Sequence, residues 1–165
     1  MWSIKKRPKS KTFFTLFDLI IEIAGLVAFL FMWILLFATY SGLPDLITTP
    51  FNISGQEDVF REKSTVFNLP LCATFLFVVT TILSRFPRIS SYPVVITESN
   101  AFLQYSYGAR LIRCLKLTIV LFFVYIVIHT VFFTGEYIGK YFLLLSLAIV
   151  LIQVIYFLVK SFKYR

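Results

Sequence analysis

Four long apolar stretches, together about half of the chain, constrain its fold more than any other feature. They cover approximately residues 13–39, 66–83, 117–133 and 141–159. A helix needs about 20 apolar residues to cross a hydrocarbon layer of about 30 Å, and every backbone polar group inside that layer must be paired within the protein. Because the stretches are continuous rather than alternating, we predict an all-α, polytopic membrane protein with a single four-helix transmembrane domain over residues 1–165.

The distribution of basic residues predicts the orientation of these helices. The N-terminal tail and the segment 84–116 each carry five Lys or Arg residues, and the C-terminal tail carries three, out of 16 in the chain. The positive-inside rule places segments of this kind in the cytoplasm. We therefore predict cytoplasmic termini, a structured outer loop over residues 40–65 and a cytoplasmic segment over residues 84–116. The net charge of +8 then reflects topology, and no nucleic-acid partner is predicted.

Three ionisable residues fall inside the predicted spans. Asp18 and Glu22 are four residues apart in the cytoplasmic third of the first span, and therefore lie on one helical face. They are expected either to stay near the headgroup layer, paired with Lys residues of the tail or the cytoplasmic segment, or to serve ion coupling or partner binding. His129 lies near the outer face, with Tyr125 before it and Glu136 after it. It fits either a protonatable relay or a hydrogen-bonded, hydrated histidine.

The cytoplasmic segment is predicted to contain an interfacial helix that runs into the third span, with Thr97 or Ser99 as its cap. The alternative is a long cytoplasmic extension of that span. The apolar side of the predicted interfacial helix consists of Phe102, Leu103, Ala109, Leu111 and Ile112, and its polar residues are Asn100, Gln104, Arg110 and Arg113. In the fourth span, Gln153 is predicted to hydrogen-bond across the bundle.

No pattern in the sequence indicates catalysis, a metal or a cofactor. The chain has one histidine, and it lacks an HExxH zinc motif, a phosphate-binding P-loop and a nucleophile elbow. Cys72 and Cys114 belong to no CxxC pair, so neither a disulfide nor a metal site is predicted from them. We therefore expect a protein that is not an enzyme and binds no cofactor.

The outer loop combines two prolines and two glycines with acidic residues, and such a loop is expected to fold against the bundle. Its acidic side chains are expected to form a solvated rim, or alternatively to gather a cation: Asp45, Glu57, Asp58 and Glu62. The same stretch carries a spaced set of residues with a family resemblance: Leu43, Pro44, Asp45, Phe51, Asn52, Gly55, Asp58 and Lys63.

This set resembles the signature of the bacterial membrane family known as domain of unknown function 1648, and Tyr92-Pro93 with Glu98 and Asn100 resembles its second marker. The chain departs from the family pattern at Thr48, where the family usually has Pro, and at Pro50, where it usually has His. The family includes the N-terminal part of immunity proteins against a secreted killing peptide. The resemblance thus implies a multi-pass protein of the bacterial cytoplasmic membrane, with immunity or signalling by membrane sequestration as a role.

Two functions follow as hypotheses. The first is a non-enzymatic membrane protein that binds a partner through its outer loop or its bundle, in an accessory, immunity or signalling-type role. Its partner would be another membrane protein or a peptide, or further copies of this chain, within the lipid bilayer. The alternative is a small oligomeric ion-coupled transporter that uses Asp18 and Glu22.

Overall fold

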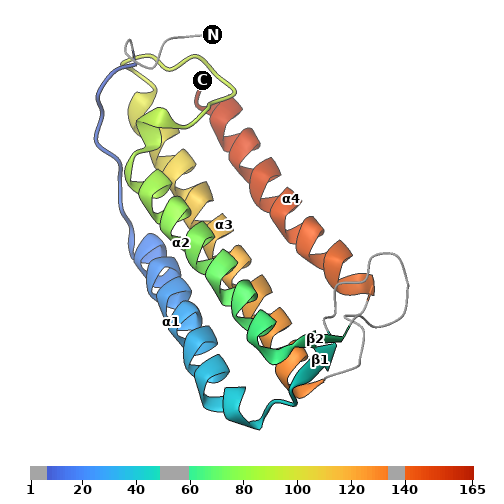
Figure 1. Ribbon diagram of the computed structural model, residues 1–165. Helices are drawn as coiled ribbons and strands as arrows, with labels where there is room; N and C mark the ends of the chain where they lie inside the picture. Colours follow the sequence, from blue (N-terminus) through green and yellow to red (C-terminus); the bar gives the residue numbers. More distant parts are fainter. Residues whose placement is uncertain (1–6, 49–59, 134–139) are drawn as a thin grey trace.

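Four long helices dominate the computed structural model, which describes residues 7–48, 60–133 and 140–165 (Figure 1). Their bounds are α1, Leu16–Thr39; α2, Asn68–Arg85; α3, Ala101–Phe132; and α4, Lys140–Lys163. Each is long and apolar enough to cross a membrane. The four predicted spans are therefore confirmed, and the chain has the helices of a multi-pass membrane protein.

Burial follows the pattern of a protein in lipid. Large apolar side chains are exposed on the outer faces of the helices, among them Ile20, Ile34, Phe75, Leu121 and Ile152. Polar side chains are buried between the helices instead, including Asp18, Gln104 and Lys116. Water would penalise this arrangement, whereas a hydrocarbon layer favours it because the polar groups find their partners inside the bundle.

Helix α1 begins at Leu16, three residues after the start of the predicted span. Thr15 caps it in a capping box, in which Asp18 N–H donates to Thr15 Oγ1 and Thr15 N–H donates to the Asp18 carboxylate at 2.9 Å. The preceding residues, 7–14, form no helix and lie along the first turns of α3. There Phe13 N–H donates to Ser106 Oγ at 2.9 Å.

Helix α3 is the centre of the bundle. Helices α1, α2 and α4 each pack on it, whereas the contact between α1 and α2 is small among the described residues. The main core joins α1, α2 and α3 through fully buried apolar residues such as Met32, Leu36, Ala73, Val120 and Val127. Within the part of the chain that the structure describes, no comparable contact joins α4 to α1 or α2. Helix α4 therefore depends on α3 for its position.

Two glutamines join α4 to α3. The first is Gln104, which is fully buried beside the C-terminal end of α4. Its Nε2 donates to the carbonyl oxygens of Ser161 at 2.8 Å and Tyr164 at 3.1 Å, and its Oε1 accepts from Ser161 Oγ. Deeper in the bundle, Gln153 Nε2 donates to Thr118 Oγ1 at 2.7 Å. The predicted hydrogen bond of Gln153 across the bundle is confirmed.

The expected interfacial helix is not a separate element. Residues 101–116 are the first half of the continuous 32-residue helix α3, as the alternative of a long extension predicted. Its N-cap is Asn100 rather than Thr97 or Ser99, and the Asn100 side chain accepts from Thr97 N–H at 2.9 Å. Polar side chains of this half, including Gln104, face the protein, while Phe102 is exposed. The helix is therefore oriented by its polar contacts within the bundle.

The end of the bundle where α4 ends is closed by the linker between α2 and α3. Val94 and Ile96 are buried there with Ala101 and Tyr105. Tyr92 lies so close to Gly108 that a Cβ on that glycine would be 2.6 Å from the Tyr92 hydroxyl oxygen. The linker, the tail 7–14 and the end of α4 thus gather at one end, opposite the strands (Figure 1).

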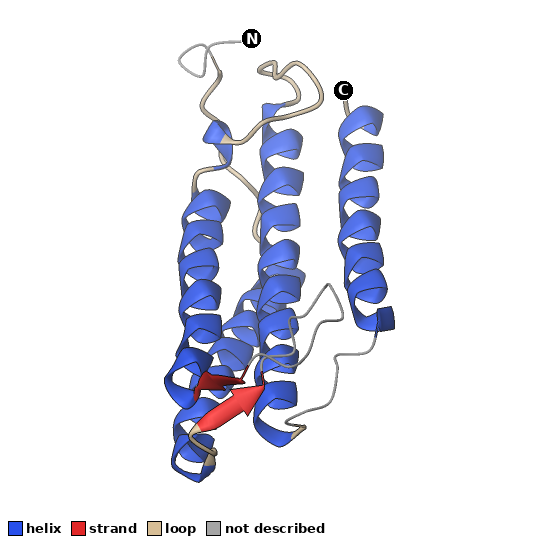
Figure 2. Cartoon of the chain, turned by 45° about the vertical axis from the view of Figure 1, so that its right-hand side comes forward, coloured by secondary structure: helices blue, strands red, loops and turns tan. Residues whose placement is uncertain are grey.

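A two-stranded antiparallel hairpin lies at the other end (Figure 2). Strands β1 (Leu46–Thr48) and β2 (Phe60–Glu62) pair Ile47 with Arg61 at their centre. Leu43, Ile47 and Val66 are buried in the main core, so the described ends of the outer loop pack on the bundle. The rest of the loop lies outside the described residues, including Phe51, Asn52, Gly55, Glu57 and Asp58.

Candidate functional site

Five ionisable side chains meet between α1 and α3. The two carboxylates of α1, Asp18 and Glu22, lie against three cations of α3, Arg110, Arg113 and Lys116. The cations are spaced three residues apart, which keeps them near one helical face. We call this group the charge cluster. The two carboxylates are thus paired with two arginines and one lysine of the segment 84–116, and not with the described lysines of the tail.

Asp18 is fully buried and its carboxylate is saturated with donors. Arg110 donates from Nε to Oδ1 at 3.0 Å and from Nη2 to Oδ2 at 2.9 Å, which is a bidentate pair. Arg113 Nη1 donates to Oδ1 at 3.3 Å. The Thr15 hydroxyl and N–H both donate to Oδ2, at 2.7 and 2.9 Å. These contacts offset the cost of burying the charge, and they also fix the start of α1 against α3.

Glu22 is held one turn further along α1. Lys116 Nζ donates to its Oε2, and Arg113 Nε lies 3.4 Å from its Oε1 without forming a hydrogen bond. The Lys116 side chain is 1% exposed, and its ammonium also donates to Thr81 Oγ1 of α2 at 3.3 Å. Lys116 therefore links all three helices of the main core at one level.

The charge cluster contains one more cation than carboxylate, since three basic side chains face two acidic ones. Aromatic rings stabilise part of this excess positive charge through cation–π contacts. The Arg110 guanidinium lies over Phe13 at 4.9 Å and the Arg113 guanidinium lies over Phe14 at 5.0 Å. Moving a proton or an ion onto Asp18 or Glu22 would require breaking these ion pairs. In this arrangement both carboxylates are paired with cations of α3, and they connect α1 to α3.

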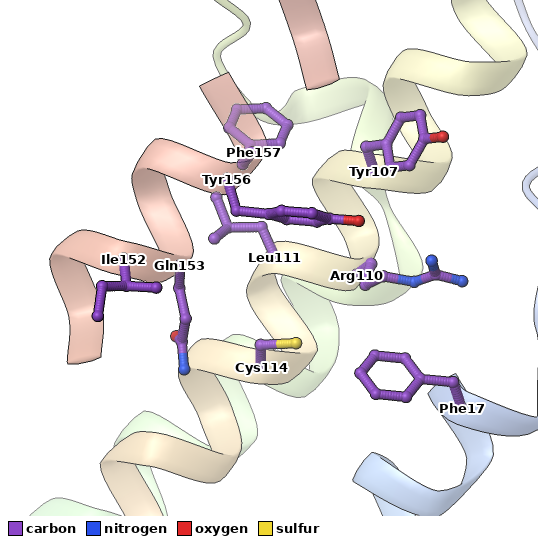
Figure 3. A pocket seen from close by; sticks show the side chains of 9 residues that line it. All are labelled: Phe17, Tyr107, Arg110, Leu111, Cys114, Ile152, Gln153, Tyr156 and Phe157. Carbon is purple, nitrogen blue, oxygen red and sulfur yellow. The ribbon is translucent and has the colours of Figure 1, made fainter. Parts of the chain in front are cut away.

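A groove begins beside the charge cluster and runs between α1, α3 and α4. Its volume is about 270 Å³ and its walls are mostly apolar: Phe17, Leu111, Cys114, Ile152 and Phe157. We call it the α1-side groove. Figure 3 shows the Arg110 guanidinium at one side of it, between Tyr107 and Phe17, with the Tyr156 hydroxyl pointing toward that side. Gln153 also lines the groove, and its buried Oε1 has no hydrogen-bond partner. Arg110 thus belongs both to the charge cluster and to the groove.

A second groove lies on the other side of the contact between α3 and α4. It has a volume of about 530 Å³ and is bounded by α2, α3 and α4. We call it the α2-side groove. It carries no charged lining residue: Leu76, Thr118, Ile119, Phe122, Phe123, Ser146, Leu147 and Val150. Both grooves exist because α4 packs on α3 without closing against the other two helices.

His129 is separated from the charge cluster by more than three turns of α3. It is 8% exposed and lies beside Tyr125, with 6.0 Å between the ring centroids, and beside Phe133 at 5.6 Å. Its Nδ1 is buried without a hydrogen-bond partner. Glu136, the third member of the predicted relay, lies outside the described residues. The structure therefore brings His129 together with Tyr125 and with none of the described carboxylates.

The described residues of the family resemblance hold the hairpin in place. Leu43 is buried in the core and Pro44 is exposed next to it. Lys63 Nζ lies 2.8 Å from Asp45 Oδ1, and Lys63 N–H donates to the Asp45 carbonyl at 2.9 Å. Among the described residues no three His, Cys, Asp or Glu side chains gather as metal ligands. The described acidic residues of this loop thus give no support to a cation site.

The ion pair of Asp45 predicts a measurable titration. The hydrogen bond from Lys63 and its charge lower the pKa of the Asp45 carboxyl below its ordinary range. Because this pKa is lower in the folded than in the unfolded state, the pair stabilises the hairpin above the unfolded pKa, and that stabilisation is lost as the pH falls through the folded one. Lys63→Met should return the Asp45 pKa to its ordinary range.

Carbon-detected NMR of the carboxyl groups in micelles measures this shift directly. Glu62→Gln is the matched control, since Glu62 accepts from Ser64 and not from Lys63. The interpretation fails if Asp45 titrates at the same pH with and without Lys63.

Comparisons with models of protein families, with curated proteins and with solved structures found no match to this chain. The family resemblance of the outer loop therefore stays a prediction.

Sequence reasoning identified Asp18 and Glu22 but not their partners as a group. The signal was present in the three basic residues spaced by three in the segment before the third span, Arg110, Arg113 and Lys116. Such a stripe next to an apolar stretch indicates a cationic helix face, which calls for carboxylates on a neighbouring helix. The grooves had no counterpart in the sequence, because they result from the placement of α4.

Proposed function

We propose that this chain is a non-enzymatic protein of the bacterial cytoplasmic membrane that binds a second membrane protein or peptide through its bundle. Its role is of the accessory, immunity or signalling type. The observation that carries the proposal is the α2-side groove, an apolar hollow of about 530 Å³ between α2, α3 and α4. The groove exposes the core helix α3 on its lipid side.

The position of the groove favours a transmembrane segment as its occupant. The α3 residues that line it follow Arg110 by about 12–20 Å along the helix: Thr118, Ile119, Phe122 and Phe123. If the charge cluster marks the inner boundary of the hydrocarbon layer, the groove lies near the middle of that layer. In this environment helices associate through close packing, and small side chains such as Thr118 and Ser146 allow a neighbouring backbone to approach.

The proposed orientation rests on the end of the bundle where the basic residues gather. The tail 7–14, the linker between α2 and α3 and the end of α4 lie together, and with Arg85 they carry eight of the 16 lysines and arginines of the chain, whereas the described residues of the hairpin end carry Arg61, Lys63 and Lys140. By the positive-inside rule this end faces the cytoplasm, so both termini are cytoplasmic and the hairpin is outside. An even number of spanning helices is consistent with this arrangement.

The alternative of an ion-coupled transporter receives less support. It would use Asp18 and Glu22, and both carboxylates are occupied by the three cations of the charge cluster. A carrier site has to bind and release its ion, whereas Asp18 is fully buried in ion pairs that cost several kcal/mol to break and the partly exposed Glu22 is paired with Lys116. A flux assay in proteoliposomes with Glu22→Gln tests this alternative directly.

The experiment that tests the proposed function is site-specific photo-crosslinking in the native membrane. A benzophenone amino acid at Leu147, which lines the α2-side groove, should give one discrete adduct with a second protein. The same amino acid at Ile34, an exposed position on the outer face of α1, is the control and should give no such adduct. Val150→Trp, which fills the groove, should remove the adduct at Leu147.

Three outcomes contradict the proposal. They are the absence of an adduct at Leu147, the same adduct at both positions, and an adduct whose mass corresponds to two copies of this chain.

A further inference from the structure

We propose that the α1-side groove binds one anionic phospholipid, with an acyl chain in the groove and the phosphate on the Arg110 guanidinium. This inference concerns a different groove from that of the proposed function and does not depend on it. It rests on the combination of an apolar channel with the Nη1 group of Arg110 at its side, which has no hydrogen-bond partner among the described residues (Figure 3).

The channel matches an acyl chain. Its walls come from three helices, with Phe17 from α1, Leu111 and Cys114 from α3, and Ile152 from α4. Because α4 packs on α3 and not on α1, the groove opens sideways toward the lipid rather than toward water. An acyl chain can therefore enter from the bilayer without first crossing an aqueous phase, and it fills a hollow that the side chains leave open.

The charge at the side of the groove selects the headgroup. Arg110 uses Nε and Nη2 for Asp18 and Thr15, so the two N–H groups on its Nη1 have no partner among the described residues. The Asp18 carboxylate already accepts from Thr15, Arg110 and Arg113, and the charge cluster keeps one excess positive charge. A phosphate oxygen on Nη1 would neutralise that charge and form a charge-assisted hydrogen bond.

The depth of Arg110 agrees with a headgroup contact. From Arg110 to the end of α3 at Phe132, the helix rises about 33 Å, close to the thickness of the hydrocarbon layer. Arg110 therefore lies near the boundary between acyl chains and phosphates when Phe132 lies at the opposite boundary. The Tyr107 and Tyr156 rings line the same groove, and tyrosine is characteristic of this interfacial level.

Native mass spectrometry of the detergent-purified full chain tests the proposal. Dioleoylphosphatidylglycerol should be retained as a single adduct about tenfold better than dioleoylphosphatidylcholine, the ratio that one charge-assisted hydrogen bond supplies. Ile152→Trp fills the groove while leaving the charge cluster intact, and it should reduce the phosphatidylglycerol adduct by about the same factor. Ile155→Trp is the matched control, because Ile155 is similarly exposed on α4 but does not line the groove, and it should leave the adduct unchanged.

A second readout uses the unmodified chain. Cys114 lines the groove and Cys72 is exposed on α2, and both are free thiols. Phosphatidylglycerol should slow alkylation of Cys114 by N-ethylmaleimide relative to Cys72, and phosphatidylcholine should not. Equal retention of the two lipids would overturn the proposal. A preference for phosphatidylglycerol that survives Ile152→Trp would also overturn it, since the basic tail would then be sufficient to explain that preference. A protein adduct to a photo-crosslinker at Ile152 would overturn it as well.

Discussion

Replacing Asp18 with Asn should destabilise the folded bundle by about 3–5 kcal/mol, the cost of removing one partner from a buried ion pair. The substitution keeps the size of the side chain but leaves Arg110 and Arg113 facing each other across a buried space without their shared carboxylate. It also removes one half of the capping box at the start of α1. The free energy of unfolding, measured by denaturant titration in mixed micelles, should fall accordingly.

Two companion variants separate the charge from the cap. Thr15→Ala removes the cap and keeps the carboxylate, so it should cost only about 1 kcal/mol. Asp18→Asn combined with Arg110→Gln should recover part of the loss, because the uncompensated charge is then smaller. A stability of Asp18→Asn equal to that of the unchanged protein would mean that the charge cluster does not hold α1 to α3.

Replacing Gln104 with Leu should loosen the C-terminal end of α4. The side chain is fully buried, and its loss leaves the Ser161 hydroxyl and the Ser161 and Tyr164 carbonyls without their partner, at about 1–3 kcal/mol for each group that stays buried. Because α4 packs on α3 rather than on α1 or α2, the effect should be local. Amide hydrogen exchange should increase in α4 and remain unchanged in α1 and α2.

Gln153→Leu provides the matched control on the same pair of helices. Gln153 forms one hydrogen bond, to Thr118, and its Oε1 is already buried without a partner. Its replacement removes a side chain whose amide oxygen already lacks a hydrogen-bond partner. Gln153→Leu should therefore increase amide hydrogen exchange in α4 much less than Gln104→Leu does. Equal effects of the two variants would contradict the role assigned to Gln104.

The sequence was sufficient for those features that depend on local composition. The four spans follow from the continuity of the apolar stretches, and the hydrogen bond of Gln153 follows from the rule that an amide in hydrocarbon needs a partner. The predicted start of α1 was less accurate. The apolar pattern begins at Phe13, but the helix can start only after Thr15, where Asp18 completes the cap.

The features that the sequence did not predict depend on how the helices are placed relative to one another. Asp18 and Arg110 are 92 residues apart, and their contact requires a particular depth and rotation of α1 against α3. The polar side of the first half of α3 suggested a surface in contact with water. It is buried instead, because the tail and the end of α4 supply hydrogen-bond partners to it. The grooves depend on the position of α4, which no local pattern encodes.

The order of the charge cluster along the chain affects how the protein is made. Asp18 is synthesised 92 residues before Arg110, which at the usual speed of translation is a delay of about 5–20 s. During that interval the two carboxylates of α1 lack the three cations that pair with them in the folded chain. Insertion of α3 then neutralises α1 and supplies the surface on which α4 packs. We therefore expect the bundle to assemble only after α3 has been inserted.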